Sequence, residues 1–583
     1  MLTVGQDLLT YGPGQRIYVP LQETGTHELS LWFAARLDDD AAGRIRVDPE
    51  EALAHLAATH DDSPDRGSTS VRLLLTPPNG GSEVTITIEA GLAAADGRTL
   101  PEPATFAVVF MEPTQVELAV TGTTYDPTGE DRRFTGADTA AHPPILRPGP
   151  AVLEAVFTRP VDPEGVEEAL RRRLPAAIRA GIPTWNADHT QLQLPLFQNV
   201  TQTLTVTLSL GQAAGQPVVR DLLGMPLVPA NPDLAWIVAV QGRVVTVDGP
   251  GTADDPLAGA GPAGQLPQLP LLRPAGAAAI QAGRMLAWHS PYTADACGPQ
   301  SLTLWHLSSG TGLPLADDVD GCLAWAAWVD EDTAVLVDRE RAVRYHVPQA
   351  TPAAEVPPDP QPIARWTPES GVVVGAALAP GAPVAVFHAP RAETAGAVNL
   401  GGTGRVDLLF LNAGGEVDRR IANVSDLVSQ EPAWSSLPAA WSPDGRVLAF
   451  VSYRADAERD DAGYPRRIEA RLTMVDAATG RVTGWDLAPL DLIWRPGRGT
   501  LWVRTPEGWY EFDPATERLQ PVATELWWAF AFSPDGRFLT GQGAEGPMVI
   551  DASTGRRVSA PAARPLGWDP ADGRAYWFEP PSS

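Results

Sequence analysis

The chain contains no lysine, so all 43 of its basic residues are arginines. Schiff-base catalysis and the Walker-type phosphate loop both need a lysine, and neither is therefore expected. Positive charge is also scarce relative to negative charge, because 71 aspartates and glutamates give a net charge of −28. Such an acidic surface repels phosphate backbones, which argues against a nucleic-acid partner.

The sequence also lacks long apolar runs and the signatures of common enzymes. No apolar stretch approaches the roughly 20 residues of a membrane helix, so no membrane span is expected. The motifs G-x-S-x-G and H-E-x-x-H are absent, and nine histidines are scattered along the chain. Acidic residues are so numerous that paired carboxylates are expected in solvated loops. We predict no catalytic residue, no metal ligand and no cofactor, and the sequence favours a non-enzyme over an enzyme.

Turn-forming residues, in contrast, are abundant, with 54 glycines and 58 prolines among 583 residues. Together with apolar runs rich in Val, Thr, Leu and Trp, this composition is typical of many short strands joined by turns. The length predicts about three or four domains. We therefore expect an all-β protein.

A first repeat lies within residues 1–232. Alternating strands are expected to end at Phe33 and at Phe157, and the tetrapeptide Val-Asp-Pro-Glu follows at 47–50 and at 161–164. Asp is a good N-cap and Pro fits the first helical position. A short helix is therefore predicted after each tetrapeptide, near 163–174 in the second copy.

The same copies share a second pattern, in which a period-2 strand is followed by a turn that contains Gly97 or Gly224. The two patterns together resemble the bacterial Ig-like domains of surface-layer and other envelope proteins. The resemblance covers roughly residues 1–113 and 114–232. It implies two Ig-like β-sandwiches of the usual ~100 residues each.

A different repeat begins near residue 233, where four-strand units recur. The turns at 442–445 and 533–536 both read Ser-Pro-Asp-Gly. Proline fits the second position of a type I turn, and glycine fits the left-handed position that follows. Each such turn is expected to join two strands, so it is interpreted as part of the scaffold.

These motifs resemble TolB-type and WD-type propellers. Counting strand sets predicts a seven-bladed β-propeller over residues 233–583, with six or eight blades as alternatives. Strands within 235–249 are expected to join the C-terminal strands and so close the ring. Tryptophans at strand positions are expected to fill the gaps between blades.

The sequence has two cysteines, Cys297 and Cys322, which the strand count places on one face of the propeller. An even count and a shared face predict a disulfide, with two buried free thiols as the alternative. Two lone cysteines are not a C-x-x-C pair, so metal binding is not expected.

A long loop at 454–467 is expected on the same face. It mixes charged and aromatic residues, as interfaces do, although a solvated excursion has the same composition. The candidate binding residues are Arg454, Asp456, Glu458, Asp460, Asp461, Tyr464, Arg466 and Arg467.

The resulting hypothesis is a non-enzymatic cell-envelope or extracellular protein. Its Ig-like domains would present a propeller that binds a protein or envelope ligand on the long-loop face. The domain content favours an exported chain whose signal segment is absent here, and a cytoplasmic location is the alternative. Two other functions stay open: a propeller enzyme, such as a carbohydrate hydrolase or lyase with carboxylates in its funnel, and a structural component of a surface array.

Overall fold

The computed structural model describes residues 2–4, 9–21, 25–38, 41–61, 68–77, 83–125, 130–139, 142–211, 218–247, 261–269, 272–290, 299–320, 323–347, 359–366, 371–390, 404–412, 415–427, 438–455, 468–522, 525–558 and 563–580. Almost all regular structure is β-strand, which confirms the all-β prediction. Among the described residues, no helix has the length and apolarity that crossing a membrane requires.

The first unit has two sheets, ordered β2-β1-β4-β7-β6 and β3-β9-β8-β5. Both sheets contribute side chains to one apolar core, which draws entirely on residues 17–110. Its strands are β1 (Leu2–Val4), β2 (Leu9–Tyr11), β3 (Arg16–Pro20), β4 (His27–Phe33), β5 (Ile45–Asp48), β6 (Leu53–Asp61), β7 (Ser68–Leu75), β8 (Glu83–Ile88) and β9 (Ala104–Met111), with 3-10 turns η1 (Ala41–Arg44) and η2 (Glu50–Ala52).

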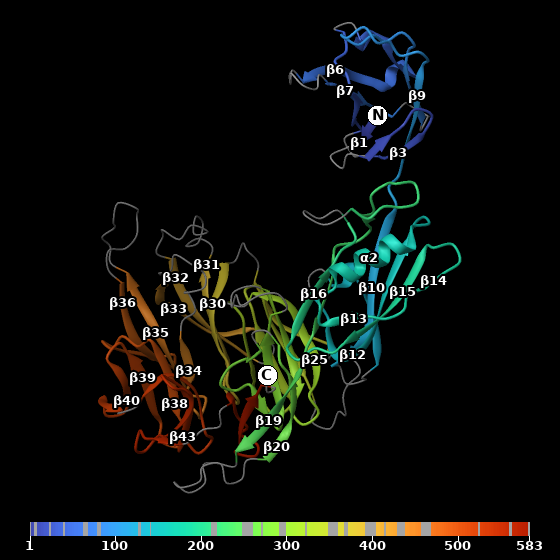
Figure 1. Ribbon diagram of the computed structural model, residues 1–583. Coiled ribbons are helices and arrows are strands. Elements are labelled where there is room, and N and C mark those ends of the chain that lie inside the picture. The colour runs from blue at the N-terminus through green and yellow to red at the C-terminus, as the bar shows by residue number, and fades with distance from the viewer. Residues whose placement is uncertain are drawn as a thin grey trace.

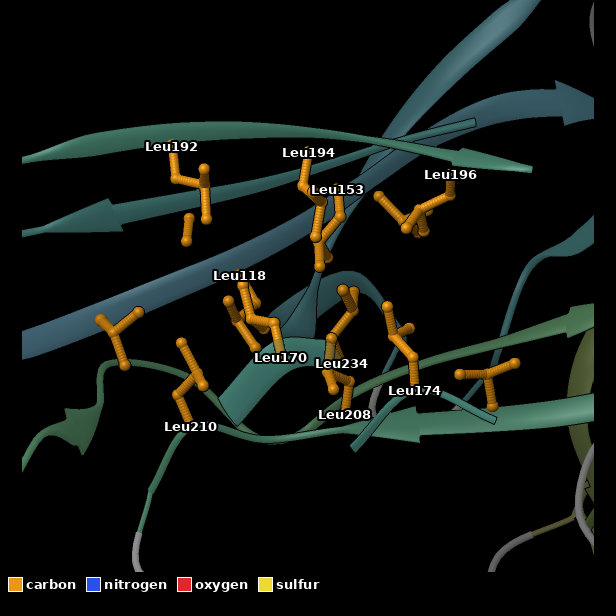
Figure 2. Close-up of a cluster of buried hydrophobic side chains, with 14 of the residues drawn as sticks. Leu118, Leu153, Leu170, Leu174, Leu192, Leu194, Leu196, Leu208, Leu210 and Leu234 are labelled. Atoms are coloured by element: carbon orange, nitrogen blue, oxygen red, sulfur yellow. The ribbon is translucent and has the colours of Figure 1, made fainter. Parts of the chain in front are cut away.

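The second unit repeats this plan around a core drawn from residues 116–238 (Figure 2). The helix α2 lies across that core and inserts the buried Val166 and Leu170. The elements are β10 (Gln115–Thr124), β11 (Asp131–Thr135), α1 (Gly136–Thr139), β12 (Ile145–Phe157), α2 (Pro163–Arg173), β13 (Ile178–Ala180), β14 (Thr184–Trp185), β15 (Gln191–Gln198), β16 (Leu204–Leu208), β17 (Val228–Pro229) and β18 (Leu234–Val238).

The strand order of the two units matches. The order β11-β10-β12-β15-β13 reproduces β2-β1-β4-β7-β6, and the parallel pair β12·β18 matches the parallel pair β3·β9. The turns match as well, since Gly97 and Gly224 both have left-handed φ values, 83° and 80°. Leu37 bridges Ala94 in the first unit, as Val161 bridges Asp221 in the second.

These bridges correct the alignment of the two copies. Leu37 and Val161 each follow the last residue of the preceding strand by the same interval, so Asp38 corresponds to Asp162. The tetrapeptide at 47–50 is therefore not the counterpart of 161–164, and the helix predicted there is wrong.

The local structure explains why no α-helix forms at that point. Asp48 is the last residue of β5 and pairs with Thr85, so its backbone is extended. Pro49 is also extended, with ψ at 147°, and only the 3-10 turn η2 follows before β6. In the second unit Asp162 is free of the sheet and accepts a hydrogen bond from the backbone N–H of Gly165 at 3.2 Å, which caps α2.

Residues 241–579 form seven sheets among their described parts. The strands, sheet by sheet, are β46 (Arg564–Trp568), β47 (Ala575–Glu579), β19 (Gln241–Val247) and β20 (Gly261–Pro267); β21 (Arg273–Pro274) and β22 (Ile280–Gln281) with β23 (Arg284–His289), β24 (Pro299–His306) and β25 (Thr311–Asp320); β26 (Trp325–Trp328), β27 (Thr333–Val337), β28 (Arg341–His346) and β29 (Gln361–Arg365); β30 (Gly371–Ala377), β31 (Val384–Pro390), β32 (Gly404–Leu411) and β33 (Val417–Leu427); β34 (Ala439–Trp441), β35 (Val447–Ala455), β36 (Ile468–Asp476) and β37 (Val482–Trp485); β38 (Asp491–Arg495), β39 (Thr500–Thr505), β40 (Gly508–Asp513) and β41 (Arg518–Val522); β42 (Leu526–Phe532), β43 (Phe538–Gly543), β44 (Gly546–Asp551) and β45 (Arg557–Val558).

The first strands of successive sheets contact one another in a closed cycle, which we call the ring. From β26 the contacts pass through β30, β34, β38, β42 and β46, then through β21 and β22 into the sheet of β23, which contacts β26. Figure 1 shows the second unit beside the ring and the first unit standing away from it. One sheet combines β19 and β20 with the C-terminal β46 and β47, so both ends of the ring segment share a sheet.

Tryptophans connect neighbouring sheets, as predicted. The indole N–H of Trp441, the last residue of β34, donates to the carbonyl of Ala377, the last residue of β30, at 3.0 Å. Trp494 donates to the carbonyl of Ala440 at the same distance. Because these bonds join the ends of neighbouring first strands, the first strands run in the same direction around the ring.

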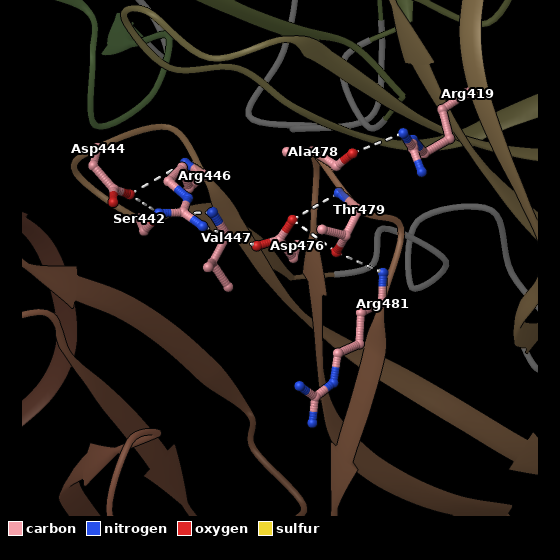
Figure 3. A network of polar contacts seen from close by, with 9 residues as sticks. All are labelled: Arg419, Ser442, Asp444, Arg446, Val447, Asp476, Ala478, Thr479 and Arg481. Carbon is pink, nitrogen blue, oxygen red and sulfur yellow. Dashed lines mark hydrogen bonds and ion pairs between the residues drawn. The ribbon is translucent and has the colours of Figure 1, made fainter.

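The Ser-Pro-Asp-Gly turns follow β34 and β42 and so lie at that end of the ring, and Figure 3 shows contacts of the first of them. The Ser442 hydroxyl donates to Asp444 at 2.6 Å and accepts the N–H of Val447 at 2.8 Å, and Gly445 has a left-handed φ of 68°. The Ser442 hydrogen bond holds the pKa of Asp444 below its ordinary value. The Ser442 hydroxyl and one Asp444 oxygen are thus used within the turn, which supports its interpretation as scaffold.

One strand was assigned to the wrong part of the chain. The sequence predicts that strands within 235–249 join the ring, but β18 pairs with β16 and β12 of the second unit. Only β19 joins the ring, where it pairs with β47. The continuous apolar run explains the error, because β18 is buried on both faces whichever sheet it belongs to.

Candidate functional site

The predicted binding loop contributes one residue to the described structure. Arg454 lies near the end of β35, where it donates to the carbonyl of Asn423 at 3.2 Å and lies 3.9 Å from Asp426. The other seven candidates, Asp456, Glu458, Asp460, Asp461, Tyr464, Arg466 and Arg467, lie outside the described residues. The predicted disulfide also lies outside them, because neither Cys297 nor Cys322 is described.

Three aromatic side chains are exposed on β42, the first strand of its sheet. Trp527, Trp528 and Phe530 are 55%, 51% and 45% exposed. Leaving about half of three aromatic side chains in water forgoes roughly 7 kcal/mol of burial, at about 25 cal/mol per Å². An apolar patch of this kind on a soluble protein usually marks a binding surface.

Two irregularities in the pairing of β42 with β43 accompany this exposure. The register shifts between Leu526 and Trp528 and again between Ala529 and Ala531, so Trp527 and Phe530 are the unpaired residues. A bulge of this type re-aims side chains that regular alternation would bury. The two irregularities therefore direct Trp527 and Phe530 towards solvent, whereas a regular strand would pack them between sheets.

Glycines on β43 permit this geometry. A Cβ atom on Gly541 would lie 2.2 Å from the Leu526 side chain and 2.4 Å from the Trp528 carbonyl oxygen. A Cβ atom on Gly543 would lie 2.9 Å from the Glu525 carbonyl oxygen. Backbone atoms cannot yield at such distances, so β42 can follow this path only beside glycine.

Polar groups of the neighbouring sheet flank the aromatic residues. The Arg504 guanidinium lies 4.1 Å from the centroid of the Trp528 ring, within cation–π range. Arg504 pairs across the sheet with Asp491, the first residue of β38. Burial raises the pKa of Asp491 to about 6, although the Leu492 N–H and the Arg504 charge both favour its ionised form.

Two further arginines begin the next first strands around the ring. Arg564 is the first residue of β46, which contacts β42, and Arg273 is the first residue of β21, which contacts β46. Burial lowers the pKa of both guanidinium groups. Arg273 donates to the side-chain oxygen of Gln300 at 3.2 Å, and Arg564 lies 5.4 Å from the Phe578 ring.

All of these residues lie at one end of the ring. Asp491 pairs with Arg504, Arg564 with Phe578, and Arg273 with Trp288, so in each sheet the first strand begins where the second strand ends. The Ser-Pro-Asp-Gly turns close the opposite end. We call the set at this end the rim cluster, and it comprises Arg273, Asp491, Arg504, Trp527, Trp528, Phe530 and Arg564.

Arg454, near the end of the second strand β35, lies at the same end of the ring. The predicted loop therefore starts on the side of the ring that carries the rim cluster. Sequence reasoning missed the cluster itself, because it treated the Leu-Trp-Trp segment as filling between sheets. Two adjacent tryptophans cannot both face the same gap in a period-2 strand, and that was the available signal.

Metal and catalytic chemistry find little support in the described parts of the chain. No group of three His, Cys, Asp or Glu side chains there could hold a metal ion. His289, the last residue of β23, is buried, and its Nε2 lies 3.0 Å from the Thr303 hydroxyl. Asp491 is the single carboxylic residue among the described first strands of the ring.

Comparison with known proteins adds little. No protein-family model matches the chain, and no curated protein matches it. Among solved structures, it is similar to regucalcin from Agrobacterium tumefaciens, described as a calcium-binding protein, with 16% identity and a TM-score of 0.19. The match covers 33% of this chain and 53% of that structure, so the chain spans about half the neighbour's length. A likeness of this degree establishes neither fold nor function.

Proposed function

We propose that this chain is a non-enzymatic, exported binding protein of the cell envelope or the extracellular space. Two Ig-like β-sandwiches, near 1–113 and 114–232, present a seven-bladed β-propeller that binds a protein or envelope ligand. The observation that carries this proposal is the rim cluster, in which three aromatic side chains about half exposed to solvent stand on one first strand of the ring.

The architecture in this proposal is supported by two features of the sheets. The two N-terminal units share one strand order and matching glycine turns, as expected of a duplicated sandwich. The ring has seven sheets among its described residues, and one of them joins strands from both ends of the segment. Such a closure protects the edge strands of a propeller.

A binding role for the rim cluster is supported by the stability that the fold loses when these aromatic side chains stay exposed. Stability alone favours burying Trp527 and Trp528, yet β42 bulges and β43 carries glycines in a way that exposes them. Features that lower stability without improving packing are typical of functional sites. The cluster also presents cations and a carboxyl group around the aromatic rings, which provides polar contacts for a ligand.

A carbohydrate-active enzyme is the second candidate, and Asp491 is the observation that favours it. Burial holds the pKa of this carboxyl group at about 6, which suits a general acid. Glycosidases use two carboxyl groups about 5–10 Å apart, and the described first strands supply only Asp491. Replacing Asp491 with Asn separates the two functions, because an enzyme would lose turnover whereas a binding protein would keep its ligand.

The proposal is tested by capture of ligands from a cell-envelope extract on immobilised protein. The comparison uses the wild-type chain, a variant with Trp527→Ser and Trp528→Ser, and a control with Trp32→Ser, whose ring is 42% exposed on the first unit. Loss of the captured material in the rim variant alone supports the proposal. Equal capture by all three proteins, or no capture by any, contradicts it.

The predicted loop is tested in the same assay. A variant in which residues 454–467 are replaced by a short Gly-Ser turn keeps the rim cluster intact. Reduced capture by this variant extends the binding surface from the rim to the loop. Capture equal to that of the wild type removes the eight loop candidates and leaves the rim cluster as the site.

A further inference from the structure

We infer that the rim cluster binds an acidic polysaccharide, with sugar rings stacked on Trp527 and Trp528 and carboxylates paired with the arginines of the rim. This inference rests on the proposed binding function and names the chemical class of its ligand.

The aromatic residues supply the first part of the argument. A pyranose ring has one largely apolar C–H face and a polar edge of hydroxyl groups. Trp527 and Trp528 offer flat apolar surfaces that are about half exposed, and Asp491 lies on the adjacent first strand. An aromatic surface bordered by polar groups matches a ligand that is apolar on one face and polar at its edge.

The arginines supply the second part. The chain carries a net charge of −28, yet the rim cluster holds three arginines and one carboxyl group. Among the named residues of the cluster the arginines outnumber the carboxyl group, and the exposed Glu507 and Glu525 lie beside them. Arginines in such a cluster can pair with anions even though the chain as a whole is acidic.

Arg504 and Arg564 both place their guanidinium groups over aromatic rings. The Nε of Arg504 is buried and has no hydrogen-bond acceptor among the described residues, although its guanidinium stacks on Trp528. Arg564 has no carboxylate partner in the described parts of the chain, and its guanidinium lies over Phe578. Stacking fixes the plane of a guanidinium and leaves its edge donors for a carboxylate.

The position on the ring favours a narrow, extended ligand over a globular partner. β42 is the first strand of its sheet, between β38 and β46. A polysaccharide chain is narrow enough to lie along β42, where Trp527 and Trp528 stand between Arg504 of one neighbouring sheet and Arg564 of the other.

The test measures the affinity of the full chain for defined polymers by affinity electrophoresis and calorimetry. The probes are polygalacturonate and alginate, which carry uronic acids; dextran, which is a neutral polysaccharide; and polyglutamate, which has carboxylates without sugar rings. We expect binding to both uronates, at least about tenfold weaker binding to dextran and polyglutamate, and an affinity for uronates that falls as salt increases.

Variants assign the binding to the rim. We expect Trp527→Ala with Trp528→Ala to weaken uronate binding at least about tenfold, because both stacking surfaces are lost. Arg564→Gln should weaken it about fivefold and reduce its salt dependence. Trp32→Ala and Arg556→Gln are the controls: the first lies on the first unit, and the second lies beside a hairpin of the β42 sheet, away from the rim. The conservative change of both tryptophans to Tyr should restore part of the affinity.

Each outcome supports or overturns the inference. Equal affinity for dextran, or an unchanged affinity in Arg564→Gln, overturns the acidic part. Equal affinity for polyglutamate shows an extended acidic peptide to be the ligand and overturns the sugar part. If no polysaccharide binds while capture from envelope extract still depends on Trp527 and Trp528, the inference fails and the proposed function stands. If neither assay responds to these tryptophans, both fail.

Discussion

The two N-terminal units share one strand order and differ in how they join the rest of the chain. The core of the first unit draws entirely on its own residues, within 17–110. The second unit has its own core as well, but Tyr125 and Ile237 also belong to an apolar cluster with ring residues such as Leu266 and Trp305. The first unit, which we call the arm, therefore has a separate core. The second unit packs against the ring, and we call this contact the joint.

The joint between the second unit and the ring is polar as well as apolar. The Tyr125 hydroxyl donates to the carbonyl of Ala239 at 2.6 Å, and the N–H of Gly312 donates to the carbonyl of Tyr125 at 2.9 Å. A cavity of roughly 500 Å³ lies beside these bonds, lined from both sides by groups that include His142 and His289. A joint held by directional bonds fixes the angle between the two parts, whereas a linker does not.

The largest expected effect follows from removing either unit. A chain that starts at residue 114 should keep its unfolding temperature within about 2 °C, because the first unit shares no core with the remainder. A chain that starts at residue 239 should aggregate, because the loss of Tyr125 and Ile237 uncovers Leu266 and its neighbours. Thermal unfolding and size-exclusion chromatography measure both. Equal damage from the two truncations would show that the units are attached alike.

Tyr125 takes part in both hydrogen bonds of the joint and also in its apolar cluster. Its side chain is 3% exposed, and Tyr125→Ala should lower the free energy of unfolding by about 3–5 kcal/mol. Tyr125→Phe, which removes the bond to Ala239, should cost about 1 kcal/mol. The matched control is Phe110→Ala in the first unit, which is equally buried. Denaturant unfolding should assign the Phe110 effect to the first unit and the Tyr125 effect to the ring and second unit. A Tyr125→Ala chain that unfolds like Phe110→Ala contradicts this assignment.

Much of this organisation could be predicted from the sequence, because short turn motifs determine it and can be recognised locally. The Ser-Pro-Asp-Gly motifs fix a backbone shape through proline, a short polar side chain and a left-handed glycine, and they mark the first hairpins of two of the seven sheets. The turns at Gly97 and Gly224 reveal the duplication in the same way. Local chemistry of this kind needs no knowledge of distant contacts.

The errors occurred where distant pairing decides the structure. The tetrapeptide at 47–50 has the composition of a helix start, but Asp48 pairs with Thr85 in a sheet. The rim cluster depends on Gly541 and Gly543 of the neighbouring strand, and a single strand read alone does not reveal a bulge. Sequence patterns identified the scaffold better than the site because scaffold turns repeat and the site occurs once.

Lowering the pH should destabilise the joint and the first unit through different histidines. Burial lowers the pKa of His289 to about 4, with a further decrease from His142 and an opposing effect of Asp317. A depressed histidine pKa means that the folded state requires the neutral ring, so the stability from His289 is complete above about pH 6.5 and is lost as the pH falls towards 4. The expected loss is about 2–3 kcal/mol.

The first unit should respond to acid through a different residue. Burial also lowers the pKa of His27, whose two ring nitrogens have no partner among the described residues. Unfolding measured between pH 7 and pH 4 should show two acid-sensitive transitions. His289→Gln should flatten the transition of the ring and second unit, and His27→Gln should flatten that of the first unit. If one variant flattens both, the two units unfold together and the arm is coupled to the ring.

The smallest expected effect concerns Asp38 and Asp162, which the bridges place at equivalent positions. Asp162 accepts the N–H of Gly165 and caps α2, so Asp162→Ala should lower the free energy of unfolding by about 1 kcal/mol. Asp38 is exposed and precedes only the 3-10 turn η1, so Asp38→Ala should change stability by less than about 0.5 kcal/mol. Denaturant titration of both variants measures the difference. An equal loss at Asp38 would contradict this difference. It would mean that the first unit also depends on a capped helix, at the point where the structure has η1 and β5.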